Sequence, residues 1–372
     1  MTHMFTPGRL GSLELENRII RSAVWEAMAD DYGFVTDRLV ACSRRLAQGG
    51  VGLLILGYSY ILPNGRQREG QTAIYANEHV PGMKRLTDAV HEAGGRVCVQ
   101  LVHCGPQTEP KRIGGETPVG PSAVDRRVFG RPRALSTDEV WTIVEEFGGA
   151  ARRAAEAGFD AIQIHGAHGY LVSQFISPLW NTRTDEFGGS LEGRMRFAVE
   201  VYQAVRSNAG SVPVLIKLNL DDFVEGSTTP DDALPLAAKL SELGIDAIEV
   251  SAGGALSGGK GPARTSIKKP EQEGYLMDLA RKTRARTTCA VIGMGGFRSP
   301  EVIDAVLESG DVDFVSMARP LIREPHLIRR WQQGDRSKAL CESCNGCFKT
   351  LGYGQGIQCL VELKARERRD DG

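Results

Sequence analysis

The segment HGAHGY, residues 165–170, brings together three side chains that could do chemistry. His165 and His168 are three positions apart, and Tyr170 follows two positions later. An imidazole can ligate zinc, pack in a core, or donate a hydrogen bond to an oxyanion. No third zinc ligand is evident beside this pair, so core packing and oxyanion binding are the main interpretations. The tyrosine adds a weak acid that can donate a proton.

Four of the eight cysteines form a second group near the end of the chain, with the spacing C-x2-C-x2-C-x11-C. Three thiols in one turn-rich segment and a fourth further on can surround a [4Fe–4S] cube. The same set can bind structural zinc, because tetrahedral thiolate sites use C-x2-C pairs. Four reduced cysteines without a metal are the third interpretation. The residues are Cys341, Cys344, Cys347 and Cys359.

Composition and charge restrict the class of protein. The chain has 372 residues, of which 41% are hydrophobic and 24% charged, as in soluble globular proteins. Its net charge of −1 gives no reason to expect binding to nucleic acid or to an anionic membrane surface. No apolar run is long enough to span a bilayer, and the start, MTHMFTPGRLG, lacks the features of a signal peptide. We therefore expect a cytoplasmic protein with reduced cysteines.

The elements that must position these groups alternate between short apolar strands and amphipathic helices. HGAHGY begins where an apolar strand ends, and Gly-rich turns such as EAGG and ELGIDA fit helix C-caps. Eight strands, each followed by a helix, predict an α/β protein with a TIM (β/α)8 barrel; an open doubly wound sheet is the alternative. The predicted strands are residues 18–23, 51–57, 96–102, 160–165, 213–218, 246–251, 289–293 and 311–317, and helices include 136–157, 191–207, 230–243 and 299–309.

In such a barrel, functional residues gather at the carboxyl ends of the strands. Gln100 and Lys217 lie at such ends, and each needs a partner when buried, so a structural salt bridge is an alternative role for Lys217. The loops 293–296 (GMGG) and 316–320 (SMARP) follow the last two strands, where barrels often bind phosphate. FMN fits these features, because a cation near flavin N1 and O2 stabilises the anionic reduced flavin.

These segments resemble the Old Yellow Enzyme family of NADH:flavin oxidoreductases over nearly the whole chain, from ENRIIRSA to SMARPLIREP. The most specific part is HGAHGYLVSQFISPLWNTRTDEFGGSLEGRMRF, residues 165–197, with VQLVHCG at 99–105 and LIKLNLDDF at 215–223 in the same order. The resemblance is nearest to the branch of 2,4-dienoyl-CoA reductase and trimethylamine dehydrogenase, whose barrels are followed by an iron–sulfur cluster. It implies an FMN-binding barrel over residues 1–335. Residues 336–372 would form an extension with a four-cysteine cluster, which would ligate [4Fe–4S], and a disordered tail.

The resemblance also implies roles for individual residues. His165 and His168 would hold the substrate as hydrogen-bond donors, and Tyr170 would donate the proton. Trp25 would lie in the substrate site, at a position where some members have a cysteine, so a covalent bond to FMN is not expected there. Lys217 stands where many members have arginine and lacks its two-pronged geometry. The expected cofactor-binding residues are Ala23, Val24, Tyr58, Gln100, Lys217, Gly295, Gly296, Ala318 and Arg319.

The implied reaction is the reduction of an activated C=C bond, as in an enone or enoate, with NADH or NADPH as co-substrate and ping-pong kinetics. An amine dehydrogenase or demethylase is a second interpretation, and a non-redox barrel lyase or isomerase is a third. The fourth is an electron-transfer component that acts between FMN and a partner protein. In each case we expect a small-molecule substrate, no nucleic acid or membrane partner, and a homo-oligomer.

Overall fold

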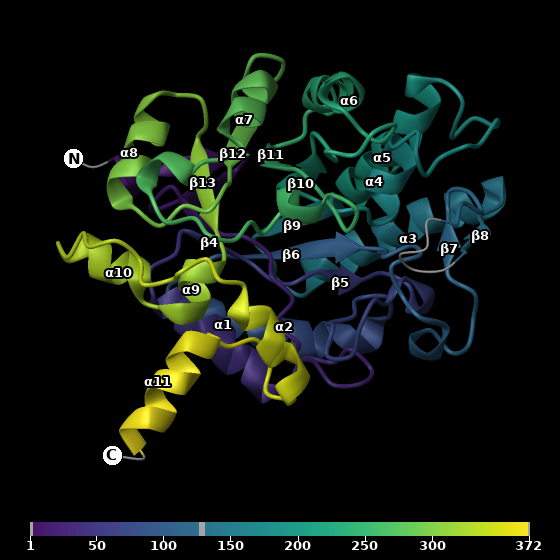
Figure 1. The fold of residues 1–372 in the computed structure, drawn as a ribbon. Coiled ribbons are helices and arrows are strands. Elements are labelled where there is room, and N and C mark those ends of the chain that lie inside the picture. Colours follow the sequence, from purple (N-terminus) through teal and green to yellow (C-terminus); the bar gives the residue numbers. More distant parts are fainter. Residues whose placement is uncertain (1–2, 126–130, 371–372) are drawn as a thin grey trace.

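The computed structural model describes residues 3–125 and 131–370, and a closed barrel of parallel strands lies at its centre (Figure 1). Within these residues, eight strands follow one another around the barrel, and the pairing of β4 with β6 closes it. The predicted TIM barrel is therefore confirmed, and the open doubly wound sheet is wrong. The strands are β3 (Ile19–Arg21), β4 (Leu53–Ile55), β6 (Val97–Val102), β9 (Ala161–Gly166), β10 (Val214–Asn219), β11 (Ala247–Ser251), β12 (Ala290–Gly293) and β13 (Phe314–Met317).

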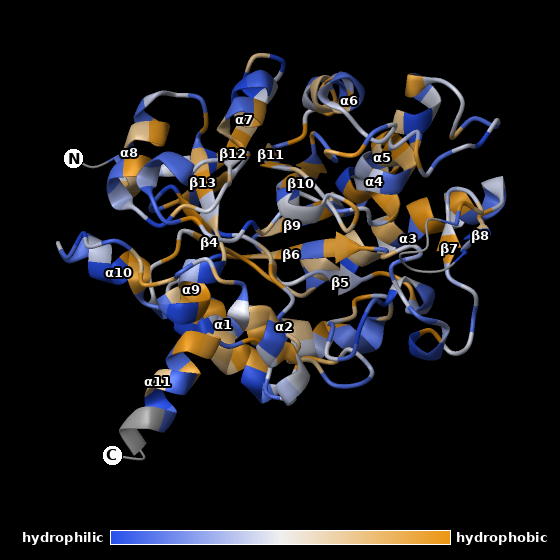
Figure 2. Ribbon diagram, viewed as in Figure 1, coloured by the Kyte–Doolittle hydropathy of each residue, from blue (hydrophilic) through white to orange (hydrophobic). Residues whose placement is uncertain are grey.

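Helices surround the barrel, and each turns an apolar face toward the strands (Figures 1 and 2). The four helices predicted from the sequence are present, and local signals explain where they begin. For example, Ser136 and Glu139 form a capping box at the start of α3. The helices are α1 (Asp37–Gln48), α2 (Val80–Glu92), α3 (Thr137–Glu156), α4 (Leu171–Ile176), α5 (Leu191–Asn208), α6 (Pro230–Glu242), α7 (Met277–Arg284), α8 (Pro300–Glu308), α9 (Arg319–Arg323) and α10 (Leu327–Gln332).

A hairpin that the sequence did not predict closes the amino-terminal end of the barrel. Its strands, β1 (Gly8–Leu10) and β2 (Leu13–Leu15), pair in antiparallel register. Leu10 and Leu15 are buried in one cluster with apolar residues of the barrel strands, such as Phe314. This end of the barrel is thus filled with side chains, which leaves the carboxyl ends of the strands for a site. Short strands also occur outside the barrel circuit: β5 (Ser59–Tyr60), β7 (Val119–Gly120) and β8 (Arg133–Ala134).

The chain continues past the barrel into an extension that ends in α11 (Leu360–Asp370), which projects away from the body in Figure 1. The charged end of the sequence, where the resemblance implies a disordered tail, continues this helix up to Asp370. Residues 371–372 lie outside the described residues. In the described part of the chain, no helix is both long enough and apolar enough to cross a membrane.

Candidate active site

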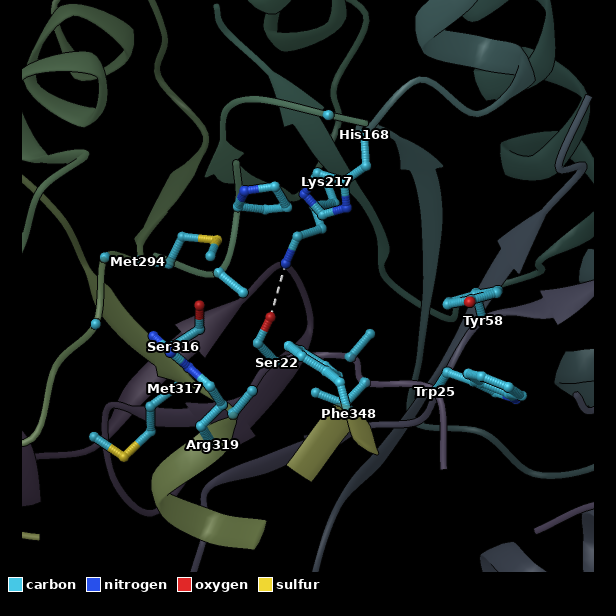
Figure 3. A pocket seen from close by; sticks show the side chains of 18 of the residues that line it. Ser22, Trp25, Tyr58, His168, Lys217, Met294, Ser316, Met317, Arg319 and Phe348 are labelled. Atoms are coloured by element: carbon cyan, nitrogen blue, oxygen red, sulfur yellow. Dashed lines mark hydrogen bonds between the residues drawn. The ribbon is translucent and has the colours of Figure 1, made fainter. Parts of the chain in front are cut away.

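A cavity of about 500 Å³ lies at the carboxyl ends of the barrel strands, where the sequence predicts the site. Most of the predicted residues line it, among them Trp25, Tyr58 and His168 (Figure 3), whereas His165 and Gln100 are buried and do not line it. The extension also contributes to the wall, through Ser343, Phe348 and Leu351. The predicted residues that line the cavity are Ala23, Val24, Trp25, Tyr58, His168, Tyr170, Lys217, Gly295, Gly296, Ala318 and Arg319.

The HGAHGY segment folds into a tight turn between β9 and α4. Its backbone has left-handed φ angles at His168 (61°) and Gly169 (78°), which reverse the chain direction. Gln107 donates a hydrogen bond from Nε2 to the backbone oxygen of His168 at 2.8 Å, and the Gly169 amide donates to Ser173 Oγ at 2.9 Å. The turn thereby directs His168 and Tyr170 into the cavity.

The three functional side chains of this segment lie together. The ring centroid of His165 is 5.1 Å from that of His168 and 4.7 Å from that of Tyr170. The backbone amide of Ala167 donates to Nδ1 of His165 at 3.3 Å, so the proton of a neutral His165 ring resides on Nε2. His168 Nε2 is 2.7 Å from the hydroxyl of Ser251 on β11. The sequence therefore identified a real spatial cluster, although His165 supports the wall rather than lining it.

Burial sets the protonation states of this cluster. It lowers the pKa of His168 to about 3, with a further contribution from the charge of Lys217. The pKa of His165 is also lowered well below its usual range, by burial, His168 and Lys217. Burial raises the pKa of Tyr170 above its ordinary value, with a smaller contribution from Cys104. Near neutral pH the cluster therefore consists of two neutral imidazoles and one protonated phenol.

The tyrosine hydroxyl shares its acceptor with a second tyrosine. Tyr170 donates to Gln67 Oε1 at 3.0 Å, and Tyr58 donates to the same oxygen at 2.6 Å. Gln67 was not found from the sequence, because it lies in a loop about a hundred residues before HGAHGY. This shared acceptor orients both phenols along one wall of the cavity.

The same wall carries a cation that the sequence analysis also missed. The guanidinium of Arg68 lies 5.3 Å from the ring centroid of Trp25, and both residues line the cavity. Its charge acts to lower the pKa values of Tyr58 and Tyr170, which places it near the phenols. This end of the cavity is therefore aromatic and positively charged.

The opposite end is formed by the two loops predicted to bind phosphate. Gly295 has φ 149°, and a Cβ there would lie 2.6 Å from the backbone nitrogen of Tyr275, so only glycine fits. Arg319 already donates from Nη1 to the backbone oxygen of Arg264 at 2.8 Å and to Asn345 Oδ1 at 2.7 Å. Arg298 was missed, although it lies two positions after the GMGG loop. It lines the cavity and is 5% exposed, and its Nε and Nη2 atoms are buried without a hydrogen-bond partner, with Nε 3.9 Å from Glu273 Oε1.

Lys217 lies on the cavity floor between these two ends. Its Nζ donates to Ser22 Oγ at 2.7 Å (Figure 3). It also donates to Glu249 Oε1 at 2.8 Å. The salt bridge that the sequence offered as an alternative role is therefore present, and the lysine still reaches the cavity. Behind the floor, Gln100 donates from Nε2 to Gln163 Oε1 at 2.7 Å, and Gln100 Oε1 is buried without a partner.

A family model described as the NADH:flavin oxidoreductase / NADH oxidase family matches residues 3–338. The chain belongs to this family. The NADH oxidase of Thermoanaerobacter brockii is 35% identical over 358 residues, which cover 94% of this chain and 54% of that protein. The chain thus spans about half the length of that relative.

Solved structures of related proteins agree with this assignment. The structure of 2-naphthoyl-CoA reductase in complex with 2-naphthoyl-CoA superposes with a TM-score of 0.88 at 26% identity, covering 96% of this chain and 56% of that chain. Morphinone reductase superposes with a TM-score of 0.76 at 31% identity, covering 90% of each chain. Membership of this family supports FMN as cofactor and NAD(P)H as co-substrate.

The residues of the cavity fit FMN. Nη2 of Arg298, which has no hydrogen-bond partner, and the glycine loop suit a phosphate, because they offer a donor and a close approach of the backbone to oxygen atoms. Lys217, which lines the cavity, supplies the cation expected beside N1 and O2, and Gln100, which does not line it, keeps a buried acceptor without a partner. Phosphate and ring recognition thus lie at different parts of one cavity.

The four cysteines of the extension lie near one another. Burial raises the pKa of Cys347 to about 11, and Cys341, Cys359 and Cys344 each add to this rise. Across residues 3–125 and 131–370, however, no three His, Cys, Asp or Glu side chains are close enough to hold a single metal ion. The iron–sulfur cluster therefore stays a prediction. The segment is linked to the site, since Phe348, next to Cys347, lines the cavity.

Proposed function

We propose that this protein uses NAD(P)H to reduce an activated C=C bond, such as that of an enone or enoate, in the cavity described above. The observation that carries the proposal is the cluster at one wall: a neutral His168 and a protonated Tyr170 both line the cavity, and the ring of His165 packs against each of them. Neutral donors suit an oxygen that gains negative charge in the reaction. A protonated phenol suits delivery of a proton to carbon. Morphinone reductase, one of the similar structures, is consistent with this proposal.

Each group has a defined task in this reaction. FMN, when bound, would carry the electrons of NAD(P)H to the substrate. His168 would donate a hydrogen bond to the substrate carbonyl oxygen, and His165 would assist from behind it. Tyr170 would protonate the α-carbon, and Gln67 would hold its hydroxyl in place. Lys217 would supply positive charge beneath the cofactor ring.

The charge of the cavity favours this reaction over amine oxidation. An amine substrate that arrives as an ammonium ion needs an aromatic or acidic site without competing cations. Here the guanidinium of Arg68 already lies over Trp25, 5.3 Å from its ring centroid, on the wall that the substrate would use. This charge would repel a cationic amine, whereas it would attract an anionic alkene such as an enoate.

An anaerobic assay with purified, FMN-loaded protein tests the proposal. The flavin is first reduced with one equivalent of NADH or NADPH, and its reoxidation is then followed with enones, enoates and, separately, with amines on the oxidised form. We expect alkenes to reoxidise the flavin and amines to leave it oxidised. Reduction of the flavin by amines, together with no reaction of alkenes, would overturn the proposal in favour of an amine dehydrogenase.

A second candidate function is electron transfer between FMN and a partner protein through a [4Fe–4S] cluster. It is favoured by the effect of Cys341, Cys344 and Cys359 on the pKa of Cys347, which indicates that they lie near it, and by Phe348, the residue after Cys347, which lines the cavity. Four thiolates suit such a cube, which holds its ligands farther apart than a single tetrahedral ion does. Anaerobic purification followed by iron and sulfide analysis tests it. We expect about four irons per chain, lost in Cys344→Ala; a protein with zinc or no metal at all would contradict it.

A further inference from the structure

A buried carboxylate lies directly beneath the cavity and takes no part in the chemistry described so far. Glu249 on β11 is 0% exposed and does not line the cavity. It is the register partner of Lys217 on β10, so the two side chains extend from neighbouring strands to the same side of the sheet. Their charged atoms, Glu249 Oε1 and Lys217 Nζ, are 2.8 Å apart.

The hydrogen bonds around Glu249 hold it as an anion. Its Oε1 accepts from Ser22 at 2.6 Å and from Ser316 at 2.7 Å, in addition to Lys217. Its Oε2 accepts from Gln163 Nε2 at 2.9 Å. Burial acts to raise the pKa of Glu249, but the lysine and these donors outweigh it and lower that pKa.

An ionised carboxylate can only accept hydrogen bonds, and this fixes the polarity of a relay across the barrel. Because Glu249 accepts from Gln163, the Gln163 amide must turn its NH₂ toward the carboxylate and its oxygen toward Gln100. Gln100 therefore turns its NH₂ toward Gln163, and its Oε1 is buried without a hydrogen-bond partner. The relay thus fixes the orientation of the Gln100 amide, although Gln100 itself does not line the cavity.

We propose that Glu249 is a positioning residue that sets the charge and the hydrogen-bond polarity beneath the flavin ring. It offsets most of the positive charge of Lys217 and keeps Nζ at Ser22, on the cavity floor. It also keeps Gln100 oriented as an acceptor, through Gln163. The potential of the bound flavin would then depend on an ion pair rather than on a lone cation. The proposal rests on the binding of FMN in this cavity.

The test is a comparison of flavin midpoint potentials, measured by anaerobic dye titration of the FMN-loaded protein at pH 7. In Glu249→Gln the positive charge of Lys217 loses its counter-charge, so we expect the potential to become more positive. We also expect tighter binding of sulfite, because its flavin adduct is anionic. Glu249→Asp, which keeps the charge but withdraws it by one methylene, should give a smaller shift in the same direction.

The matched control is Glu26→Gln, since Glu26 forms another buried ion pair, 2.8 Å from Arg21, and does not line the cavity. It should leave the potential and the sulfite affinity unchanged. A wild-type potential in a flavin-bound Glu249→Gln or Glu249→Asp protein, or an equal shift in the control, overturns the proposal. Failure of the proposed function is distinguishable, because it would show as wild-type protein that binds no FMN or reduces no alkene.

Discussion

Replacing Tyr170 by phenylalanine should slow the reduction of the alkene without disturbing the fold. The substitution removes one hydrogen bond, to Gln67 Oε1, but that oxygen keeps the shorter bond from Tyr58 at 2.6 Å. No buried acceptor is left without a partner, so the free energy of unfolding should fall by only about 1 kcal/mol. Loss of a positioned general acid lowers the rate of the step that needs it by about 10²–10⁴-fold.

The two half-reactions separate this effect from a general disturbance. Reduction of the flavin by NAD(P)H needs no proton from Tyr170, so its rate should stay within a few-fold of wild type. Reoxidation by an enone should be slowed, as measured by anaerobic stopped-flow absorbance at the flavin band. Because burial raises the pKa of Tyr170, the wild-type phenol stays protonated, and this step should not decline between neutral and mildly basic pH.

Tyr60→Phe is the matched control for this variant. Tyr60 is buried and also donates one hydrogen bond, to the backbone oxygen of Tyr32 at 3.2 Å, but it does not line the cavity. Both half-reactions should therefore proceed normally in this protein. The reasoning is refuted if Tyr170→Phe slows both halves equally, or if it reoxidises as fast as wild type.

Four further outcomes follow from the site. His165→Ala combined with His168→Ala should retain the flavin spectrum but reduce enone turnover by about 10²–10³-fold, because the donor to the substrate oxygen is lost, and near wild-type turnover would contradict this. Lys217→Met should lower the free energy of unfolding in urea by about 3–5 kcal/mol, since the carboxylate of Glu249 is left buried without a counter-charge. An unchanged urea midpoint of unfolding, at an unchanged m-value, would show that the ion pair does not stabilise the fold. Arg298→Ala should weaken FMN binding about tenfold to a hundredfold in fluorescence titrations of the apoprotein, because a charge-assisted contact to phosphate is lost; equal affinity would place the phosphate elsewhere. The lowered pKa values of His103 (about 3) and His165 mean that the unfolded chain binds more protons below pH 6.5, so stability should fall with decreasing pH by about 1.4 kcal/mol per unit for each; urea unfolding at pH 7.5, 6 and 5 measures the slope, which His103→Gln should reduce.

Local sequence patterns predict much of the fold. Short apolar runs separated by amphipathic stretches identified all eight barrel strands, because a strand buried on both faces needs a continuous apolar sequence. The hairpin of β1 and β2 was not predicted, since it is stabilised by contacts with residues far along the chain, such as Phe314. Helix α11 was also missed, because a charged composition alone does not distinguish a helix from an irregular tail.

The sequence likewise predicts some residues of the candidate site and not others. The sequence by itself determined that His165, His168 and Tyr170 lie at one strand end, since the turn that holds them is formed by adjacent residues. It also contained signals that were not used: a glutamate in DAIEVS and a glutamine in DAIQIH stand within apolar strands, where a polar residue needs a partner. Such a signal shows that a partner exists but not which residue it is.

Only the tertiary structure decided the partners. Lys217 meets Glu249 because β10 and β11 are in register. Glu249 also meets Ser22 and Ser316, because closure of the barrel brings the first and last strands together. Arg68 also lies near the phenols only because of the tertiary structure, since no sequence pattern predicts where its loop lies. The sequence fixes which chemical groups lie at strand ends. Their distances, and hence their charge states and acceptor roles, depend on the register of the closed barrel, which is set by all of its strands at once.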